Sequence, residues 1–224
     1  TDDFVLKRAD SILKELDKRK MYHVRLIYNT NFSKSKFKGT DIFELWNKFD
    51  SVSIGASLDA MGPRAELMRK GTVWEETEAN RKRMLEVCPQ VDFYISSTVG
   101  LSNALHVVDF HRDWVEKGFI KPQDFNFNLL QYPLWQRMDL LPQNEKDKVT
   151  AKYKEHMEWL KDKDHLTRAS KGFESALDWM NKKDMSRHMP TFVNETRKYD
   201  KIRNENFTDV FPEWKELFAQ YEKN

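Results

Sequence analysis

A chain of 224 residues that is 39% hydrophobic and 13% aromatic has enough apolar side chains to build a large folded domain around a core. Its 38 Lys and Arg against 36 Asp and Glu give a net charge of +2, which argues against a broad nucleic-acid interface, and its one cysteine, Cys88, excludes an internal disulfide framework. No apolar run approaches the roughly 18 residues that span a bilayer, and the charged N-terminal stretch lacks a signal-peptide pattern, so we expect a cytoplasmic protein.

Helical and strand patterns alternate along the first two thirds of the chain. In chain order, the spacing of apolar residues predicts a helix over 4–19, a strand over 22–31, a helix over 40–49 capped by Thr40, a strand over 51–59, a short helical run after Gly62-Pro63, a helix over 74–88, a strand over 92–99, a helix over 103–118 ended by Gly118, and a strand over 125–133. Alternation at this spacing is typical of a parallel sheet with helical crossovers.

The pattern changes near residue 143. Amphipathic helices are predicted over 144–164, 167–184, 190–204 and 213–223, and nothing in this part of the sequence has a strand pattern. The chain therefore divides into an α/β region over 1–140 and a helical C-terminal extension over 141–224.

Each predicted strand has one apolar and one polar side. In 51–59, Val52, Ile54, Ala56 and Leu58 alternate with Ser53, Gly55, Ser57 and Asp59; the polar members of the other strands are Asn29 and Asn31, Ser96 and Thr98, and Asn126 and Asn128. An unpaired buried polar group costs roughly 1–3 kcal/mol, so we expect these sides to line a solvent- or ligand-filled cavity near the carboxyl ends of the strands. An ordinary sheet with one face open to solvent is the alternative.

Several segments resemble the later part of radical S-adenosylmethionine (SAM) enzymes of the SPASM or twitch type. They are "LIYNTNF" (26–32), similar to a third-strand motif that ends in Thr-Asn-Gly; "SVSIGASLDAMGPRAELMRKGTVW" (51–74), similar to the fourth-strand motif; "ISSTVGLSNALHVVDFHRDWVEKG" (95–118); "NLLQYP" (128–133); and "KYDKIRNENFTDVFPEW" (198–214), similar to the tail of some twitch-type members. The resemblance covers about 22–133, more loosely 195–214, and 51–74 is its most specific piece. It implies a partial parallel β/α barrel of strands three to six, followed by a helical extension in the twitch position.

The sequence departs from the family at defining positions. The Cys-x-x-x-Cys-x-x-Cys motif, which ligates the [4Fe–4S] cluster, and the Gly-Gly-Glu motif are both absent, and Ala60 and Phe32 stand where the family usually has Gly. The resemblance therefore implies the C-terminal portion of a radical SAM iron–sulfur enzyme, inactive without the N-terminal half of the barrel that binds the cluster. A half barrel would also have an unpaired sheet edge, so oligomerisation is expected.

The resemblance also implies which residues contact SAM and substrate. Hydroxyl and amide groups suit ribose and adenine, and Arg69 suits the methionyl carboxylate of SAM. The candidate cofactor-binding residues are Ser57, Arg69, Asn29, Asn31, Ser96, Thr98, Asn103, Asn128 and Gln131, and the candidate catalytic residue is Asp59, which could orient substrate or transfer a proton.

Each of the main candidates also has a structural interpretation. Asp59 could form a local turn, Arg69 could pair with Glu66 or Glu75, and Asn103 could cap the following helix. Of the histidines, His106 and His111 lack the spacing of a metal pair, and His156, His165 and His188 are expected to be solvated. Cys88 is expected to be a buried structural thiol.

Two other functions remain open. The chain could be a non-catalytic, degenerate homologue that binds a small molecule or peptide, or an unrelated α/β protein that binds a sugar or phosphate. A membrane partner is not expected. The sequence does not indicate a substrate.

Overall fold

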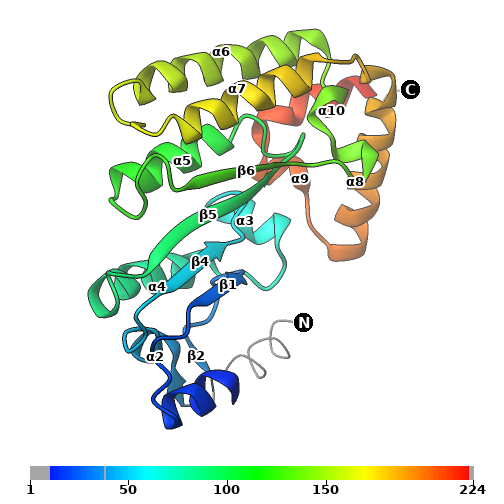
Figure 1. Cartoon of the computed structure of the whole chain (residues 1–224). Helices are drawn as coiled ribbons and strands as arrows, with labels where there is room; N and C mark the ends of the chain where they lie inside the picture. The colour runs from blue at the N-terminus through cyan, green and yellow to red at the C-terminus, as the bar shows by residue number, and fades with distance from the viewer. Residues whose placement is uncertain (1–10, 38, 222–224) are drawn as a thin grey trace.

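A four-stranded parallel sheet forms the centre of the protein (Figure 1). The structure is a computed structural model and describes residues 11–37 and 39–221. The strands stand in the order β1-β4-β5-β6, with β1 over Leu26–Thr30, β4 over Val52–Ala56, β5 over Asp92–Val99 and β6 over Phe125–Leu129. Strands β2 (Lys36–Phe37) and β3 (Thr40–Asp41) pair separately and antiparallel. Neighbours in the main sheet follow one another along the chain, so the predicted parallel α/β arrangement is confirmed.

Helices connect the strands and make up the rest of the chain. Between the strands lie α2 (Ile42–Trp46), α3 (Pro63–Met68), α4 (Trp74–Val87) and α5 (Val107–Glu116). After β6 come η1 (Leu134–Gln136), η2 (Met138–Leu140), α6 (Gln143–Leu160), α7 (Arg168–Asn181), η3 (Ser186–His188), α8 (Met189–Arg203), α9 (Phe207–Val210), η4 (Pro212–Trp214) and α10 (Lys215–Tyr221). Residues 130–221 contain no strand, so the predicted helical C-terminal region is confirmed.

Some predicted element ends differ from the structure. Of the helix predicted over 4–19, residues 11–18 are helical and 4–10 lie outside the described residues. Thr40 was expected to cap α2, and this is wrong: Thr40 pairs with Phe37, and the Asp41 carboxylate accepts hydrogen bonds from the amides of Phe43 and Glu44. Gly118 has a φ of 70° just after α5, which is the left-handed conformation that ends a helix.

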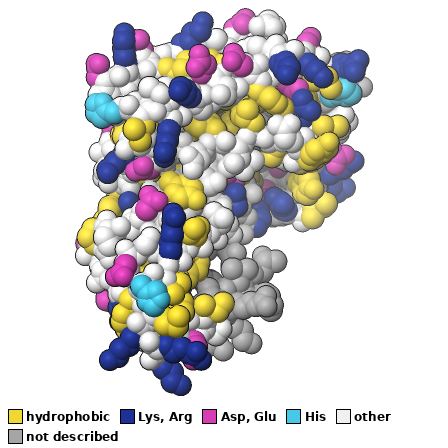
Figure 2. Space-filling model, viewed as in Figure 1, with side chains coloured by type: hydrophobic (Ala, Val, Ile, Leu, Met, Phe, Trp, Pro, Cys, Tyr) yellow, Lys and Arg dark blue, Asp and Glu magenta, His cyan; other side chains and the backbone are white. Residues whose placement is uncertain are grey.

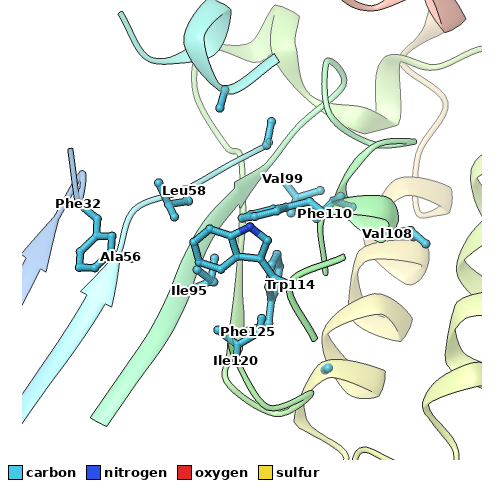
Figure 3. Packing of buried hydrophobic residues seen from close by; sticks show 14 of the residues in the cluster. Phe32, Ala56, Leu58, Ile95, Val99, Val108, Phe110, Trp114, Ile120 and Phe125 are labelled. Carbon is cyan, nitrogen blue, oxygen red and sulfur yellow. The ribbon is translucent and has the colours of Figure 1, made fainter. Parts of the chain in front are cut away.

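The core lies between the sheet and the helices on one side of it. Trp114 of α5 is fully buried and contacts Phe110, Phe119 and Trp74 edge-on or tilted, and it stacks on Phe93 of β5. Figure 3 shows apolar side chains of β4, β5 and α5 converging on this indole. Helix α2 covers β1 through Trp46 and Tyr28, and α7 covers β6 through Phe173 and Phe127. The apolar sides of all four strands therefore face helices, as predicted.

Charged side chains of both signs cover the outer helices. On the face shown in Figure 2, Lys and Arg lie among Asp and Glu over α6 and α7 at the top of the molecule. Within residues 11–37 and 39–221, no helix combines the length and the apolar character that a bilayer-crossing segment requires.

The contact between α7 and β6 depends on Gly172. A Cβ atom at this position would lie 2.2 Å from Cδ2 of Phe127. Gly172→Ala would gain up to about 1 kcal/mol of helix propensity, but the ring has to move, so we expect a net loss of about 1–2 kcal/mol in the free energy of unfolding. Urea denaturation measures this loss. In a Phe127→Leu background the same substitution should cost less, and an equal cost in both backgrounds would contradict the explanation.

Candidate functional site

Strand register brings the polar side chains of the sheet to one face. Asn29 of β1 lies opposite Gly55 of β4, which lies opposite Tyr94 of β5. Ser96 and Thr98 of β5 lie opposite Asn126 and Asn128 of β6. We call this side the polar face; its hydroxyl, amide and phenol side chains towards the carboxyl ends of the strands are Asn29, Ser57, Tyr94, Ser96, Thr98, Asn126 and Asn128. The register also places Ile27, Ser53 and Asp92 on this side. The predicted sidedness of the four strands is confirmed, since residues paired in register share a face.

Two of the candidate cofactor-binding residues contact each other on the polar face. The amide nitrogen Nδ2 of Asn128 donates a hydrogen bond to Oγ of Ser96, at 2.9 Å. Asn128 is exposed and Ser96 half-buried. The Ser96 hydroxyl still has a proton to donate and the Asn128 carbonyl can still accept, so the pair offers one donor and one acceptor to a ligand.

Asn29 meets a residue that the sequence analysis did not select. A Cβ atom on Gly55 would lie 2.6 Å from Oδ1 of Asn29 and 2.9 Å from the hydroxyl oxygen of Tyr94, so both side chains reach over this glycine. Gly55 therefore leaves room for an amide and a phenol at the centre of the polar face. The alternation along β5, which puts Tyr94 in phase with Ser96 and Thr98, could have identified it.

Asp59 connects three parts of the chain just beyond β4. Its Oδ1 accepts a hydrogen bond from the backbone amide of Thr98 at 2.7 Å, and its Oδ2 accepts one from Nε of Arg69 at 2.7 Å. The side chain is 8% exposed. The alternative for Asp59 was a local turn, in which the carboxylate bonds to a neighbouring backbone group. The observed partners, Arg69 and Thr98, are instead 10 and 39 residues away in the sequence. The carboxylate holds the ends of two strands and the α3 segment together.

Arg69 is held by the same cluster. Besides Asp59, it donates from Nη1 to Oδ1 of Asn31 at 3.2 Å. The alternative pairing with Glu66 or Glu75 is not seen for Arg69; Glu66 instead accepts a hydrogen bond from the backbone amide of Trp74. Three candidate residues are thus brought together at the carboxyl end of β1 and β4, where the guanidinium is 29% exposed.

Asn103 is fully buried behind this cluster. Its Oδ1 accepts from the Gly100 amide at 2.9 Å, and its Nδ2 donates to the carbonyl oxygens of Asp59 and Thr98 at 2.7 and 3.0 Å. The expectation that Asn103 caps the following helix is wrong, since α5 begins at Val107 with His106 in the cap position. Its amide is used within the fold, and its contact with a cofactor stays a prediction.

Replacing Asn103 should destabilise the protein. Asn103→Ala leaves the buried Gly100 amide and two carbonyl oxygens without the partner that Asn103 provides, and we expect a loss of about 2–4 kcal/mol in the free energy of unfolding. Chemical denaturation measures it. Asn126→Ala, on the exposed part of the polar face, is the matched control and should change stability by less than about 0.5 kcal/mol.

The remaining candidates lie around the rim. Ser57 is half-buried and its backbone amide donates to the carbonyl oxygen of Thr30, which continues the β1–β4 ladder. Gln131 is exposed and donates from Nε2 to the carbonyl oxygen of Leu129. The side chain of Thr98 is half-buried on the polar face. Among the described residues, the side chains of Ser57, Thr98 and Gln131 form no hydrogen bond with the Asp59 carboxylate.

The residues present do not fit an iron–sulfur cluster. Cys88 is buried, and burial raises the pKa of its thiol to about 11, which disfavours the thiolate that a metal requires. In the part of the chain that the structure describes, no three His, Cys, Asp or Glu side chains gather in a way that could hold a metal ion.

Histidines provide a second set of buried polar contacts. Nε2 of His106 accepts from the Met61 amide at 3.2 Å and so fixes the loop that follows Asp59. Nδ1 of His111 and Nε2 of His156 are 2.8 Å apart, and both rings are fully buried. His165 and His188 are exposed as expected, whereas the expectation that His156 is solvated is wrong. It lies in phase with Val149, Tyr153 and Leu160 on the buried side of α6.

Comparison of the chain with models of protein families, with curated proteins and with solved structures found no match. Its function is therefore argued from the residues and geometry described above.

Proposed function

We propose that this chain is the part of a radical SAM iron–sulfur enzyme that lines the SAM and substrate cavity. The observation that carries the proposal is the polar face, on which hydroxyl and amide side chains from four successive parallel strands point the same way. Ligands of open α/β sheets bind at the carboxyl ends of the strands, where Asn31, Asp59 and Gln131 follow β1, β4 and β6. The cluster belongs to a separate N-terminal half, which this chain would need for activity.

The backbone conformation of Phe32 supports the likeness of residues 26–32 to the third-strand motif. Phe32 has a φ of 57°, in the left-handed region that favours glycine. The third-strand motif that 26–32 resembles has glycine at this position. Phe32 thus adopts a backbone conformation that glycine favours, although the residue differs; the Phe32 ring is buried against Phe43 and Phe93.

The polar face fits a nucleoside better than a charged group. Its side chains towards the carboxyl ends of the strands are neutral, whereas Asp92 lies at the first residue of β5 and accepts a hydrogen bond from Ser53. The neutral groups offer donors and acceptors at fixed positions, as ribose hydroxyls and an adenine edge require. In this assignment Ser96 and Asn128 bind the ribose or adenine, and Tyr94 offers an aromatic surface for the base. These residues would hold SAM, and a reduced cluster in the N-terminal half would supply the electron for its radical chemistry.

Arg69 and Asp59 have a positioning role in this proposal. The Arg69 guanidinium keeps donor groups beyond those that bind Asp59 and Asn31, and one of these could pair with the SAM carboxylate. Asp59 orients Arg69 and holds the Thr98 backbone, so it shapes the site. Its role as a catalytic residue remains part of the proposal.

Nuclear magnetic resonance titration of the 224-residue chain tests the ligand assignment. We expect weak, saturable binding of SAM and of adenosine, with shifts at the amide groups of Asn29, Ser96 and Asn128, and no comparable shifts with methionine. The Ser96→Ala, Asn128→Ala double variant should weaken adenosine binding by about tenfold, while Asn181→Ala, a remote exposed amide on α7, should not. Shifts that avoid the polar face would contradict the proposal.

The activity itself is tested on the complete gene product. Anaerobic reconstitution with iron and sulfide should give the absorbance of a [4Fe–4S] cluster, and a strong reductant should then release 5′-deoxyadenosine from SAM. A colourless complete product that still binds adenosine would support the second candidate, a non-catalytic binding module. That candidate is favoured by one contact: the charge of Arg69 is already balanced by Asp59.

A further inference from the structure

An apolar groove lies between the segment that follows β6 and the start of α8. Its walls are Leu134, Trp135, Arg137, Leu140, Met185, His188 and Thr191, and its volume is about 230 Å³. This volume is below the 300–1,000 Å³ that is typical for a whole small-molecule ligand. The groove therefore has the size for a single large side chain of a partner. Methionine and leucine walls can adapt to the shape of such a side chain.

Exposed aromatic and aliphatic residues lie at the groove and further along α8. Trp135 stacks on Tyr199 of α8 with the ring centroids 6.2 Å apart. Leu134, Tyr199 and Ile202 are 52%, 43% and 78% exposed. Large apolar side chains that gather at the rim of a groove are typical of a site for a protein or peptide.

A basic hollow continues from the groove along α8. It is lined by Thr191, Asn194, Glu195, Arg197, Lys198 and Lys201, and it shares Thr191 with the groove. Glu195 bonds to Lys198 at 2.6 Å, and Arg197 bonds to Asp200 and Asn206, so Lys201 adds a positive charge beyond these pairs. Across residues 182–203 there are seven Lys and Arg against three Asp and Glu, which gives +4, whereas the whole chain carries +2. Figure 2 shows basic and hydrophobic side chains mixed on the side where α8 lies.

We propose that the apolar groove and the basic hollow bind an acidic peptide segment of a partner protein, with one large apolar side chain in the groove and carboxylates beside Lys198 and Lys201. Charge complementarity selects an acidic partner, and the mainly apolar lining of the groove, with leucine, methionine and tryptophan side chains, selects an apolar side chain. This inference goes beyond the proposed function and does not depend on it, because neither SAM nor the polar face takes part.

Fluorescence anisotropy of a labelled peptide tests the inference. The probe is a short Gly-Ser peptide with one Phe followed by several Glu, and the comparison probes replace Phe with Ser or all Glu with Gln. We expect saturable binding of the first probe, and binding at least about tenfold weaker for each of the others. No binding of the Phe-Glu probe, or equal binding of all three, would overturn the proposal.

Variants of the protein locate the binding. Thr191→Trp fills the groove from an exposed position of α8, and Lys198→Glu with Lys201→Glu reverses the charge of the hollow. Each should weaken binding by at least about tenfold, whereas Lys161→Glu with Lys171→Glu, at exposed positions of the α6–α7 pair, should leave it unchanged. Leu134→Gln provides a second groove variant should Thr191→Trp perturb α8 in circular dichroism.

Two other occupants are tested in the same experiment. Single-stranded RNA of similar length is tested as a competing partner. If it binds more tightly than the peptide, and if the lysine variants but not Thr191→Trp weaken its binding, the partner is a nucleic acid. Analytical sedimentation tests self-association. If the chain self-associates and Thr191→Trp abolishes this, the partner is a second copy of the chain. Either result overturns the proposal.

Discussion

Asp59→Ala is expected to lower the free energy of unfolding by about 3 kcal/mol, although the residue lies outside the strands. The substitution removes the acceptor for the Thr98 backbone amide and the counter-charge of Arg69. The first loss leaves a backbone donor unsatisfied, which costs about 1–3 kcal/mol. The second leaves a guanidinium that is 29% exposed, so water can compensate part of its lost ion pair.

Matched variants separate the two contributions. Asp59→Asn keeps an oxygen that can accept from Thr98 but removes the charge, so it should cost about half as much as Asp59→Ala. Arg69→Gln and the double variant complete a cycle, and because Asp59 and Arg69 are in contact their effects should not add. Additive effects in urea denaturation would show that the ion pair contributes nothing.

The same variants bear on the role of Asp59 in the proposed enzyme. A residue that only positions Arg69 and Thr98 should affect adenosine binding and stability together, and Asp59→Asn should lose about half as much of each as Asp59→Ala. A residue that transfers a proton should lose turnover in Asp59→Asn far beyond the partial loss of binding and stability expected for this variant. Comparing binding, stability and 5′-deoxyadenosine release in one variant therefore distinguishes positioning from catalysis.

The sequence was informative where a local period determines the structure. Alternation along 92–99 predicted both the bounds of β5 and the side on which Ser96 and Thr98 lie, because neighbouring residues of a strand point to opposite faces. The partnership of Asn31, Asp59 and Arg69 was not predictable in the same way. These residues are up to 38 positions apart, and the loops that join them after β1 and β4 have no period.

His156 is an instructive failure of the sequence analysis. Many charges in "NEKDKVTAKYKEH" suggested a solvated helix, but Val149, Tyr153, His156 and Leu160 recur at spacings of four, three and four and are all fully buried. This is the spacing of a helix side that packs on a core. The charged residues of this segment obscure the spacing, because histidine occurs on both the exposed and the buried sides of helices.

The buried pair His111 and His156 should make the protein sensitive to mild acid. The carbonyl oxygen of Pro122 can only accept from Nε2 of His111, at 3.0 Å, so Nδ1 of His111 must accept from Nε2–H of His156. Nδ1 of His156 then carries no proton and has no hydrogen-bond partner. Burial lowers the pKa of His111 to about 4, and burial with the neighbouring His111, Arg112 and Lys152 lowers that of His156 to about 2. The pair is therefore neutral in the folded protein.

Mild acid destabilises the folded protein, because the unfolded chain binds protons that the folded chain does not. Below the ordinary histidine pKa of 6.5 the unfolded chain takes up protons at both positions and the folded chain does not, so stability falls as the pH falls from 6.5 towards 4. Each histidine costs up to about 1.4 kcal/mol per pH unit in this window, so the pair should cost about 4 kcal/mol between about pH 7 and pH 5. Urea denaturation over a pH series measures the slope.

One substitution within the pair and one outside it test this assignment. His156→Gln retains an amide that can donate to Nδ1 of His111 but does not titrate, so the loss of stability between neutral and mildly acidic pH should fall by about a third, because His111 and the buried His106 still contribute. His165→Ala, at an exposed position after α6, should leave the slope unchanged. The buried His106, whose pKa burial also lowers to about 4, keeps a residual slope in both variants. An unaltered slope in His156→Gln would mean that groups other than this pair set the acid limit, because the substitution removes one of the two protons that the unfolded chain gains there.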